Sequence, residues 1–430
     1  MKPSVAATGG WLLMLSVLLS LVAQITGLFS GYWAGLPIWL VVMLFVSYVK
    51  PTQRKQIILL MLLGSIGLLY GVFKGLDGRY LLKALDANQT VVAMIVGVGF
   101  LRIFAVNSVK TGETLPQGKS AVIRTLLGAH LFGTVLNISS VMIIGDKLAT
   151  QSKLRTTQGL VLLRGFAACA LWSPFFASMG LALTSAPGSE LGTLVSYGIP
   201  VCAVALAISG WQLVRRADAD SVSGYPISIY SLWMPALLAS VVIAAHKFYP
   251  HISVLSLVTL TSLCFIALWL LINKGYHAIV AARNHIESGI ANSSGEVVLF
   301  AAAAMLASGV AASLDAMNIQ LAPQHFGPIE ASVTVAVLIA LAMTGMHPVT
   351  SVVLAGSVLA PSMADPNMLG LTLLMGWSLG ITASPFSGVQ LSIQSRYDIS
   401  AKALLKANWR YITIMYLVCC SVLWWYSTQI

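Results

Sequence analysis

Long apolar runs separated by short polar loops fill this sequence from end to end. Each run is close to the about 20 residues that a helix needs to cross a membrane, so we predict eleven spanning helices. The first run lacks a convincing cleavage site and is expected to stay as a helix rather than be removed as a signal peptide. The predicted spans cover residues 8–28, 31–49, 56–74, 89–109, 156–186, 190–213, 226–246, 252–273, 296–314, 367–395 and 409–428.

Two further apolar segments, residues 118–148 and 326–361, are too long for one ordinary span. Each has small and polar residues near its centre, including His130 in the first and His347 in the second. We predict that both are re-entrant hairpins, which enter and leave the membrane on the same side.

Composition supports a membrane protein and gives an explanation of the positive net charge that does not involve nucleic acid. Only 9% of the residues are charged and 58% are hydrophobic, whereas a soluble domain is about a quarter charged. The net charge of +11 comes from short basic clusters between apolar runs, so we expect no nucleic-acid partner. The five cysteines lie inside apolar runs without metal-ligand spacing, which predicts neither disulfides nor a metal site.

The positions of Lys and Arg predict the orientation, because cytoplasmic loops are enriched in these residues. With both hairpins in place, the N-terminus is cytoplasmic, the C-terminus is periplasmic, and the expected location is a bacterial inner membrane. The second hairpin is flanked by Asp315, Glu330 and Asp365, as expected outside. The residues then placed in the cytoplasm are Lys2, Lys50, Arg54, Lys55, Lys110, Lys119, Arg124, Lys147, Lys153, Arg155, Arg215, Arg216, Lys274, Arg283, Arg396, Lys402, Lys406 and Arg410.

A pair of matching motifs indicates an internal repeat. Gly-aromatic, six residues and Ser-Pro-Phe occur at 165–175 and again at 376–386, each time after a Gly-x-His. The predicted orientation makes the two copies inverted, which is typical of secondary transporters. We expect residues 1–88 to be scaffold helices, 89–213 the first repeat, 214–295 further scaffold helices with a cytoplasmic interfacial arm, and 296–430 the second repeat.

The repeated motifs also suggest chemistry. A proline in mid-span removes an N–H and frees a carbonyl one turn earlier, and such groups are tolerated only in protein or a water-filled cavity. We therefore expect a cation site made from Ser173, Pro174, Ser178, Thr382, Ser384, Pro385 and Ser387.

Hairpin tips point helix N-termini toward the centre of the membrane, where they favour an anion. The expected substrate-binding residues are Gly128, His130, Asn137, Gly345, His347 and Gln390. The competing interpretations are histidines packed against carbonyls, prolines that only kink helices, and small polar residues that serve helix packing. Arg102 and Arg164 are expected to extend their side chains to the cytoplasmic interface.

The segment from Gly376 to Trp409 resembles the last part of the divalent anion/sodium symporters of the ion transporter superfamily. It has a broken helix, a short polar turn and the lead Lys402-x-x-Leu-Lys-Ala into the final helix. The hairpins match in position, although Gly-Ala-His130 and Gly-Met-His347 stand where the family has Ser-Asn-Thr tips. The resemblance covers residues 89–213 and 296–428 and implies an all-α fold of eleven spans and two hairpins in two inverted repeats, and a homodimer.

These patterns predict a secondary active transporter that moves a small, carboxylate-like organic anion by alternating access, coupled to Na⁺ or H⁺. No cofactor beyond the coupling ion and no catalytic residue is expected. The alternative is an efflux permease or exchanger of the same fold for an oxyanion or an amphiphile. A membrane enzyme would need a cluster of carboxylates or a His–Asp pair at the interface, and the sequence shows no such grouping. Two half-sites made by broken helices imply occlusion, which disfavours a channel.

Overall fold

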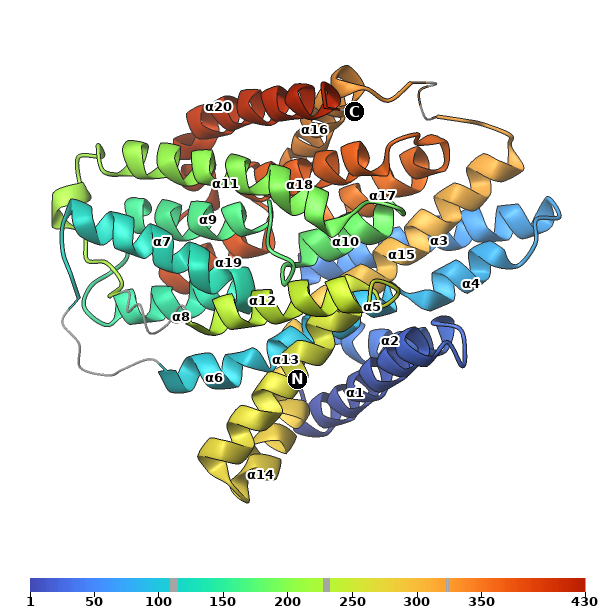
Figure 1. Cartoon of the computed structure of the whole chain (residues 1–430), viewed down its shortest axis with the longest axis horizontal. Coiled ribbons are helices and arrows are strands. Elements are labelled where there is room, and N and C mark those ends of the chain that lie inside the picture. Colours follow the sequence, from blue (N-terminus) through green and yellow to red (C-terminus); the bar gives the residue numbers. More distant parts are fainter. Residues whose placement is uncertain (109–114, 227–232, 322, 324, 430) are drawn as a thin grey trace. The chain divides into compact units, whose positions relative to one another are not determined.

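The computed structural model describes residues 1–108, 115–226, 233–321, 323 and 325–429, and Figure 1 shows that they form helices. No β-strand occurs among these residues. The predicted all-α class is therefore confirmed for the described part of the chain. Lys110 and parts of the predicted spans 89–109 and 226–246 lie outside the described residues.

Seven helices of the described residues are long and apolar enough to cross a membrane by length and composition. Four shorter apolar helices accompany them. This content identifies a multi-pass membrane protein, while the number of eleven crossings stays a prediction. The seven are Pro3–Thr26, Gln53–Phe73, Arg79–Ala105, Leu191–Leu213, Val254–Lys274, His277–Ala316 and Pro366–Tyr397.

The chain forms two compact units, each built from several stretches of sequence. Unit 1 comprises Met1–Ala105, Leu238–Ala322 and Val353–Pro361, and unit 2 comprises Val106–Leu237, Pro323–Val352 and Ser362–Ile430. Unit 2 thus gathers segments from both predicted repeats. Helices α6 (Leu101–Ser108), α12 (Trp233–Phe248) and α17 (Pro348–Leu359) each contain a boundary between the units.

Unit 1 holds α1 (Pro3–Thr26), α2 (Tyr32–Phe45), α3 (Pro51–Phe73), α4 (Arg79–Asp86), α5 (Gln89–Gly99), α13 (Val254–Lys274), α14 (His277–Asn284) and α15 (Ser294–Ala316). Helices α3 and α15 approach closely through glycines: a Cβ added to Gly64 would lie 2.5 Å from the Met305 carbonyl oxygen. Small residues that let helix backbones touch are the usual means of packing in membranes.

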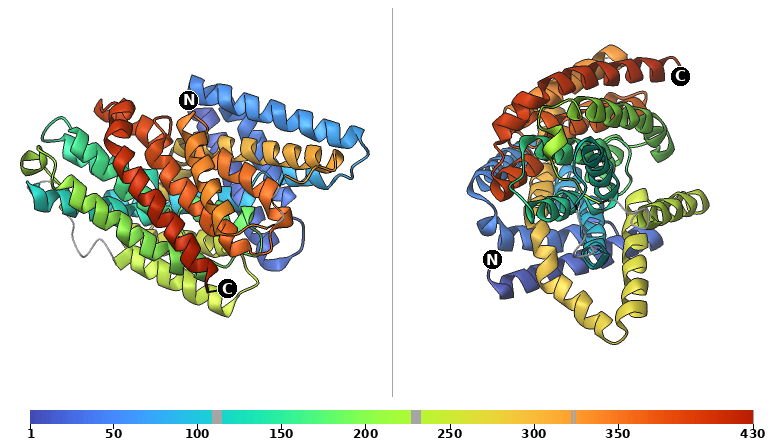
Figure 2. Two further views of the ribbon diagram at one scale, coloured as in Figure 1. Left: turned by 90° about the horizontal axis from the view of Figure 1, so that it is seen from above. Right: turned by 90° about the vertical axis from the view of Figure 1, so that its left-hand side faces the viewer.

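The predicted interfacial arm, residues 274–295, is not a separate helix. After Gly275, α14 passes through a π-helical turn and a 3₁₀ turn directly into α15. In the right-hand view of Figure 2, α13 and this following stretch form a V. Its position at a membrane interface stays a prediction.

Unit 2 holds α7 (Lys119–Leu136), α8 (Ile138–Ala149), α9 (Thr156–Cys169), α10 (Ala177–Ser185), α11 (Leu191–Leu213), α16 (Pro328–Met343), α18 (Pro366–Ala383), α19 (Gly388–Tyr397) and α20 (Ala401–Ser427). Helix α9 packs against α7, and α18 against α16. The repeated glycines explain this pattern, because a Cβ at Gly165 would lie 2.8 Å from the Leu126 carbonyl oxygen, and one at Gly376 would collide with Leu338.

Ion pairs join the two predicted repeats at one end of unit 2. Arg396, near the end of α19, donates from Nε and Nη2 to the two carboxylate oxygens of Asp146 on α8, at 2.6 and 2.7 Å. Lys153 lies 2.7 Å from Asp398 and lowers the pKa of that carboxyl below its ordinary value. This end of the unit is therefore held by charge as well as by packing.

Candidate functional site

The first predicted broken helix is interrupted between α9 and α10, at Ser173-Pro174. Ser173 Oγ donates to the Thr134 carbonyl at 2.5 Å and accepts the N–H of Phe175 at 3.2 Å. Ser178 Oγ donates to the Ala170 carbonyl at 2.7 Å. Hydroxyl groups thus satisfy carbonyls around the break, as expected where a helix is interrupted inside a membrane protein.

The bend between α7 and α8 lies at Asn137 and touches this break. Asn137 has φ 50° and ψ −141°, a conformation that costs a non-glycine residue about 1–3 kcal/mol. Its Nδ2 donates to the Phe175 carbonyl at 3.2 Å. A strained bend held by the broken helix is the first half of the candidate site.

The first Gly-x-His is not at the hairpin tip, and this prediction was wrong. Gly128 and His130 lie inside α7, about two turns before Asn137. The reason is local: α7 runs unbroken to Leu136, and Asn137, which has a positive φ, stands between α7 and α8. The tip equivalent to His347 is therefore Asn137, not His130.

His130 is a buried residue whose ring nitrogens are both occupied. Its side chain is 4% exposed. Nδ1 lies 3.2 Å from the Gly165 carbonyl and Nε2 accepts from Trp172 Nε1 at 3.3 Å, which together favour the neutral form with its proton on Nδ1. Contact of His130 with a substrate stays a prediction, and in this conformation it would require Trp172 to move.

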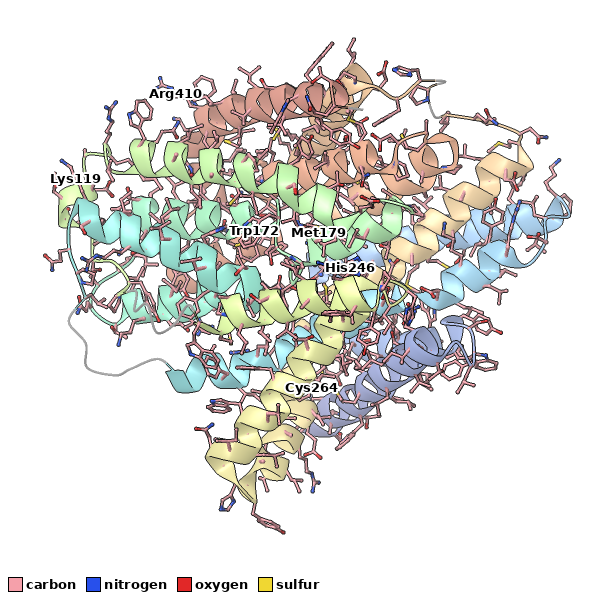
Figure 3. The ribbon with its side chains drawn as sticks, viewed as in Figure 1. Lys119, Trp172, Met179, His246, Cys264 and Arg410 are labelled. Carbon is pink, nitrogen blue, oxygen red and sulfur yellow. The ribbon has the colours of Figure 1, made fainter. Side chains whose placement is uncertain are left out.

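Figure 3 labels Trp172, in the first break, and Met179, in α10 beyond it. Met179 stands at the same distance after Ser173-Pro174 as Gln390 stands after Ser384-Pro385. One half thus has an apolar side chain where the other has an amide.

The second hairpin bends between α16 and α17, and here the Gly-x-His does form the tip. Gly345 has φ +106° and lies against Phe386, where an added Cβ would be 3.4 Å from the ring. His347 Nδ1 accepts the N–H of Val349 at 3.2 Å, so the neutral imidazole carries its proton on Nε2. Within the described residues Nε2 makes no hydrogen bond, and an added Cβ on Gly388 would lie 3.9 Å from it.

The second broken helix is interrupted between α18 and α19, at Ser384-Pro385. Ser384 Oγ accepts the N–H of Phe386 at 3.2 Å, and Ser387 Oγ donates to the Ile381 carbonyl at 3.1 Å. Thr382 Oγ1 donates back to Leu379 at 2.8 Å. These hydroxyls have protein partners in this conformation.

The side chain of Gln390, in the first turn of α19, forms hydrogen bonds across the second break. It is fully buried, and its Nε2 donates to the carbonyls of Ile381 and Thr382 at 3.0 and 3.1 Å. Its Oε1 is buried and has no hydrogen-bond partner among the described residues, and the same holds for Oγ1 of Thr350 in the first turn of α17. Buried polar atoms normally have partners, so these two oxygens are candidates for contact with a ligand.

Equivalent positions of the two motifs meet. Ser378 Oγ donates to the Ala167 carbonyl at 2.8 Å, and each residue stands two places after the motif's glycine. Sequence reasoning missed Asn408, fully buried in α20, which donates to the Thr382 carbonyl at 3.3 Å. It belongs to no motif, so no sequence signal marked it.

No protein-family model matches the chain, and no curated protein matches it. Among solved structures, that of the Alcanivorax borkumensis YdaH transporter, described as having an unusual topology, is similar at 14% sequence identity. The match covers 85% of this chain and 83% of that chain, with a TM-score of 0.42.

Proposed function

We propose that the chain is a secondary active transporter that moves a small, carboxylate-like organic anion by alternating access, coupled to Na⁺ or H⁺. The observation that carries this proposal is the pairing of each hairpin bend with a broken helix. Asn137 bonds to the first break, and Gly345 and His347 lie against the second. Irregular backbone at membrane depth is tolerated where it is buried in protein or lines a cavity, and both arrangements fit a bound solute.

Contact between equivalent positions supports the inverted repeats, 89–213 and 296–430. Two copies related by a two-fold axis can touch through the same position only at the axis. Ala167 and Ser378 touch in this way. A site that the two repeats share, with an axis passing through it, is the arrangement found in transporters that alternate access.

An anionic substrate fits the second half of the site. The proton on His347 Nε2 points toward the break, where a carboxylate can accept it. Pro348 begins α17 directly after this histidine, so the partial positive charge of a helix N-terminus adds to the attraction. Gly345 keeps the tip open because its φ excludes most side chains.

The coupling ion fits the oxygen atoms at the breaks. Hydroxyls and backbone carbonyls suit a hard cation such as Na⁺, and Gln390 Oε1 and Thr350 Oγ1 have no hydrogen-bond partner in the described part of the chain. The remaining proposed cation ligands, Ser173, Ser178, Thr382, Ser384 and Ser387, would exchange a protein partner for the ion, with Pro174 and Pro385 keeping the breaks open. A proton carried by His347 is the other coupling mode.

Gradient-driven uptake tests the proposal. The purified chain in proteoliposomes is expected to accumulate a small carboxylate when an inward Na⁺ gradient or an inward proton gradient is imposed. If no carboxylate of a panel accumulates under either gradient, the proposal is contradicted. Uptake that needs only a preloaded internal anion would instead identify the alternative, an exchanger of the same fold.

A histidine variant tests the site. His347→Ala is expected to abolish uptake and leave the unfolding temperature unchanged within a few degrees, because the imidazole makes a single local hydrogen bond. His325→Ala, an exposed histidine before α16, is the matched control. Normal uptake by His347→Ala would show that this histidine contributes to packing and is not needed for transport.

A further inference from the structure

Helices α9, α11 and α20 of unit 2 enclose a cavity of about 540 Å³ that the transport site does not use. Its lining includes the four arginines Arg164, Arg215, Arg216 and Arg410 and the two tryptophans Trp211 and Trp409. Among the described residues, no Asp or Glu lines it. A cavity with four guanidinium groups and no carboxylate is suited to an anion.

The charge of this arginine cavity is largely uncompensated. Arg216 lies 3.8 Å from Asp218, but in the described part of the chain the other three arginines form no ion pair with a carboxylate. Three positive charges around one cavity repel one another, and a bound anion would remove that repulsion.

Arg164 is the strongest indication of a bound anion, because its side chain is buried. It is 2% exposed and does not extend to an interface, so that prediction was wrong. Its Nε donates to Asn408 Oδ1 and its Nη1 to Gln212 Oε1, both at 2.8 Å, and its guanidinium lies 4.3 Å from the centre of the Tyr411 ring. All these partners are neutral, and a buried charge inside a membrane protein normally has an opposite charge or a ligand.

The rim of the cavity is aromatic and exposed. Trp211 and Trp409 are 54% and 58% exposed, and each lies under an arginine: Arg215 is 4.3 Å from the first ring and Arg410 is 5.6 Å from the second. Arg410, labelled in Figure 3, lies in the third turn of α20. Tryptophan is enriched at the membrane–water interface, where its ring sits at headgroup level.

An apolar surface continues from this rim along α20. Ile414 and Leu417 are 38% and 59% exposed, one and two turns beyond Arg410. A small soluble anion would make no contact with such an apolar surface, whereas the acyl chains of a lipid would pack against it. The combination of a cationic cavity, an aromatic rim and an apolar helix face matches an amphiphile with a phosphate head.

We propose that the arginine cavity binds the phosphate headgroup of an anionic phospholipid. Guanidinium groups bind phosphate through two parallel hydrogen bonds, and basic pockets between membrane helices on the cytoplasmic side are known to hold such headgroups. Free phosphate shares the recognition chemistry, and the apolar face of α20 favours the lipid.

Lipid binding to the full-length chain tests this inference independently of transport. Native mass spectrometry of the detergent-solubilised protein measures the affinity for cardiolipin or phosphatidylglycerol against that for phosphatidylcholine. Each arginine near the surface contributes about five-fold in affinity, which corresponds to about 1 kcal/mol. Arg215→Gln combined with Arg410→Gln is therefore expected to weaken binding of the anionic lipid by about 25-fold.

The matched control removes two charges from the same helix outside the cavity. Lys402→Gln combined with Lys406→Gln alters exposed residues of α20 that do not line the cavity, so its affinity is expected to stay within about two-fold of the unmodified chain. Equal losses in both double variants would show that general surface charge attracts the lipid and would overturn the proposal.

Two further arms separate the sources of phosphate. Glycerol phosphate and inorganic phosphate at millimolar concentration are expected not to displace the lipid, and displacement by either would assign the cavity to a soluble anion instead. Phosphatidylglycerol with brominated chains is expected to quench tryptophan fluorescence more than brominated phosphatidylcholine does. The difference in quenching between the two lipids is expected to be smaller in Trp409→Phe. Equal quenching by the two lipids would also overturn the proposal.

Discussion

Replacing Gln390 by methionine separates a structural role of this amide from a role in transport. Methionine is the residue at the equivalent position of the first half, Met179, and has nearly the same shape as glutamine. The change removes the two hydrogen bonds from Nε2 to the Ile381 and Thr382 carbonyls and removes the buried Oε1 that has no protein partner.

The structure predicts a small effect on stability. Each lost hydrogen bond costs about 1 kcal/mol, but Ser387 still donates to the Ile381 carbonyl and Asn408 to that of Thr382. Removing an unsatisfied buried oxygen gains about 1–3 kcal/mol. The two effects offset each other, so the free energy of unfolding is expected to change by about 1 kcal/mol or less.

Transport is expected to respond far more strongly. If Oε1 contacts the coupling ion or the substrate, its loss removes a charge-assisted contact of about 2–3 kcal/mol. That corresponds to a rise of about 30–150-fold in the half-saturating concentration of the ligand concerned. Uptake into proteoliposomes as a function of Na⁺ and of substrate concentration measures the change, and thermal unfolding in detergent measures stability.

Gln89→Met is the matched control, because Gln89 on α5 is also buried and its Oε1 also has no hydrogen-bond partner in the described residues. It lies in unit 1, outside the proposed site, so its uptake should be unchanged. Unchanged uptake by Gln390→Met in a folded protein would refute the reasoning about the second break.

Substitutions at three further positions test other parts of the structure by thermal unfolding in detergent. Asn137→Ala is expected to lose about 1–3 kcal/mol of stability through its strained φ and its missing hydrogen bond, whereas Asn137→Gly should lose less; equal losses would contradict the strain. Gly309→Leu should cost more than about 2 kcal/mol by forcing α15 away from α3, and a stable variant would contradict the close contact. Asp146→Asn should cost about 1 kcal/mol or less, because the pair with Arg396 is half exposed, and the loss should shrink at high salt.

The breaks in the two predicted broken helices were readable from the sequence because their cause is local. A proline has no N–H to donate, and the helices are interrupted at Ser173-Pro174 and Ser384-Pro385. Pro37 and Pro200 lie inside the unbroken helices α2 and α11, so the repeated motif, and not proline alone, marked the two breaks. The glycine of each motif was also a usable signal, since close helix packing requires a missing side chain at Gly165 and Gly376.

The first hairpin tip was misplaced because it was assigned from a shared sequence motif, whereas the position of the turn depends on backbone conformation. Gly128 and His130 share a pattern with Gly345 and His347, but a helix tolerates glycine and histidine, and α7 continues past both. It ends only at Asn137, whose φ is positive. The sequence contained it, but no spacing rule distinguished it from the other small polar residues nearby.

The surroundings of Arg164 could not be predicted because they are tertiary. Its partners Gln212, Asn408 and Tyr411 come from α11 and α20, which are distant in sequence and carry no recognisable motif. A sequence pattern reports that an arginine lies in an apolar run. Only the packing of three helices shows that neutral amides hold it inside.

The orientation of the two hairpins tests the inverted repeat, on which the proposed transport mechanism depends. A cysteine is placed at Ser152, between α8 and α9, or at Gln320, after α15, in a chain whose five own cysteines have been replaced. Both positions are exposed. A thiol reagent that cannot cross the membrane, applied from the periplasmic side of intact cells, should label the cysteine at 320 and leave the one at 152 unlabelled until the membrane is opened. Labelling of both positions from the same side would contradict the inversion, and with it the account of one site shared by two opposed repeats.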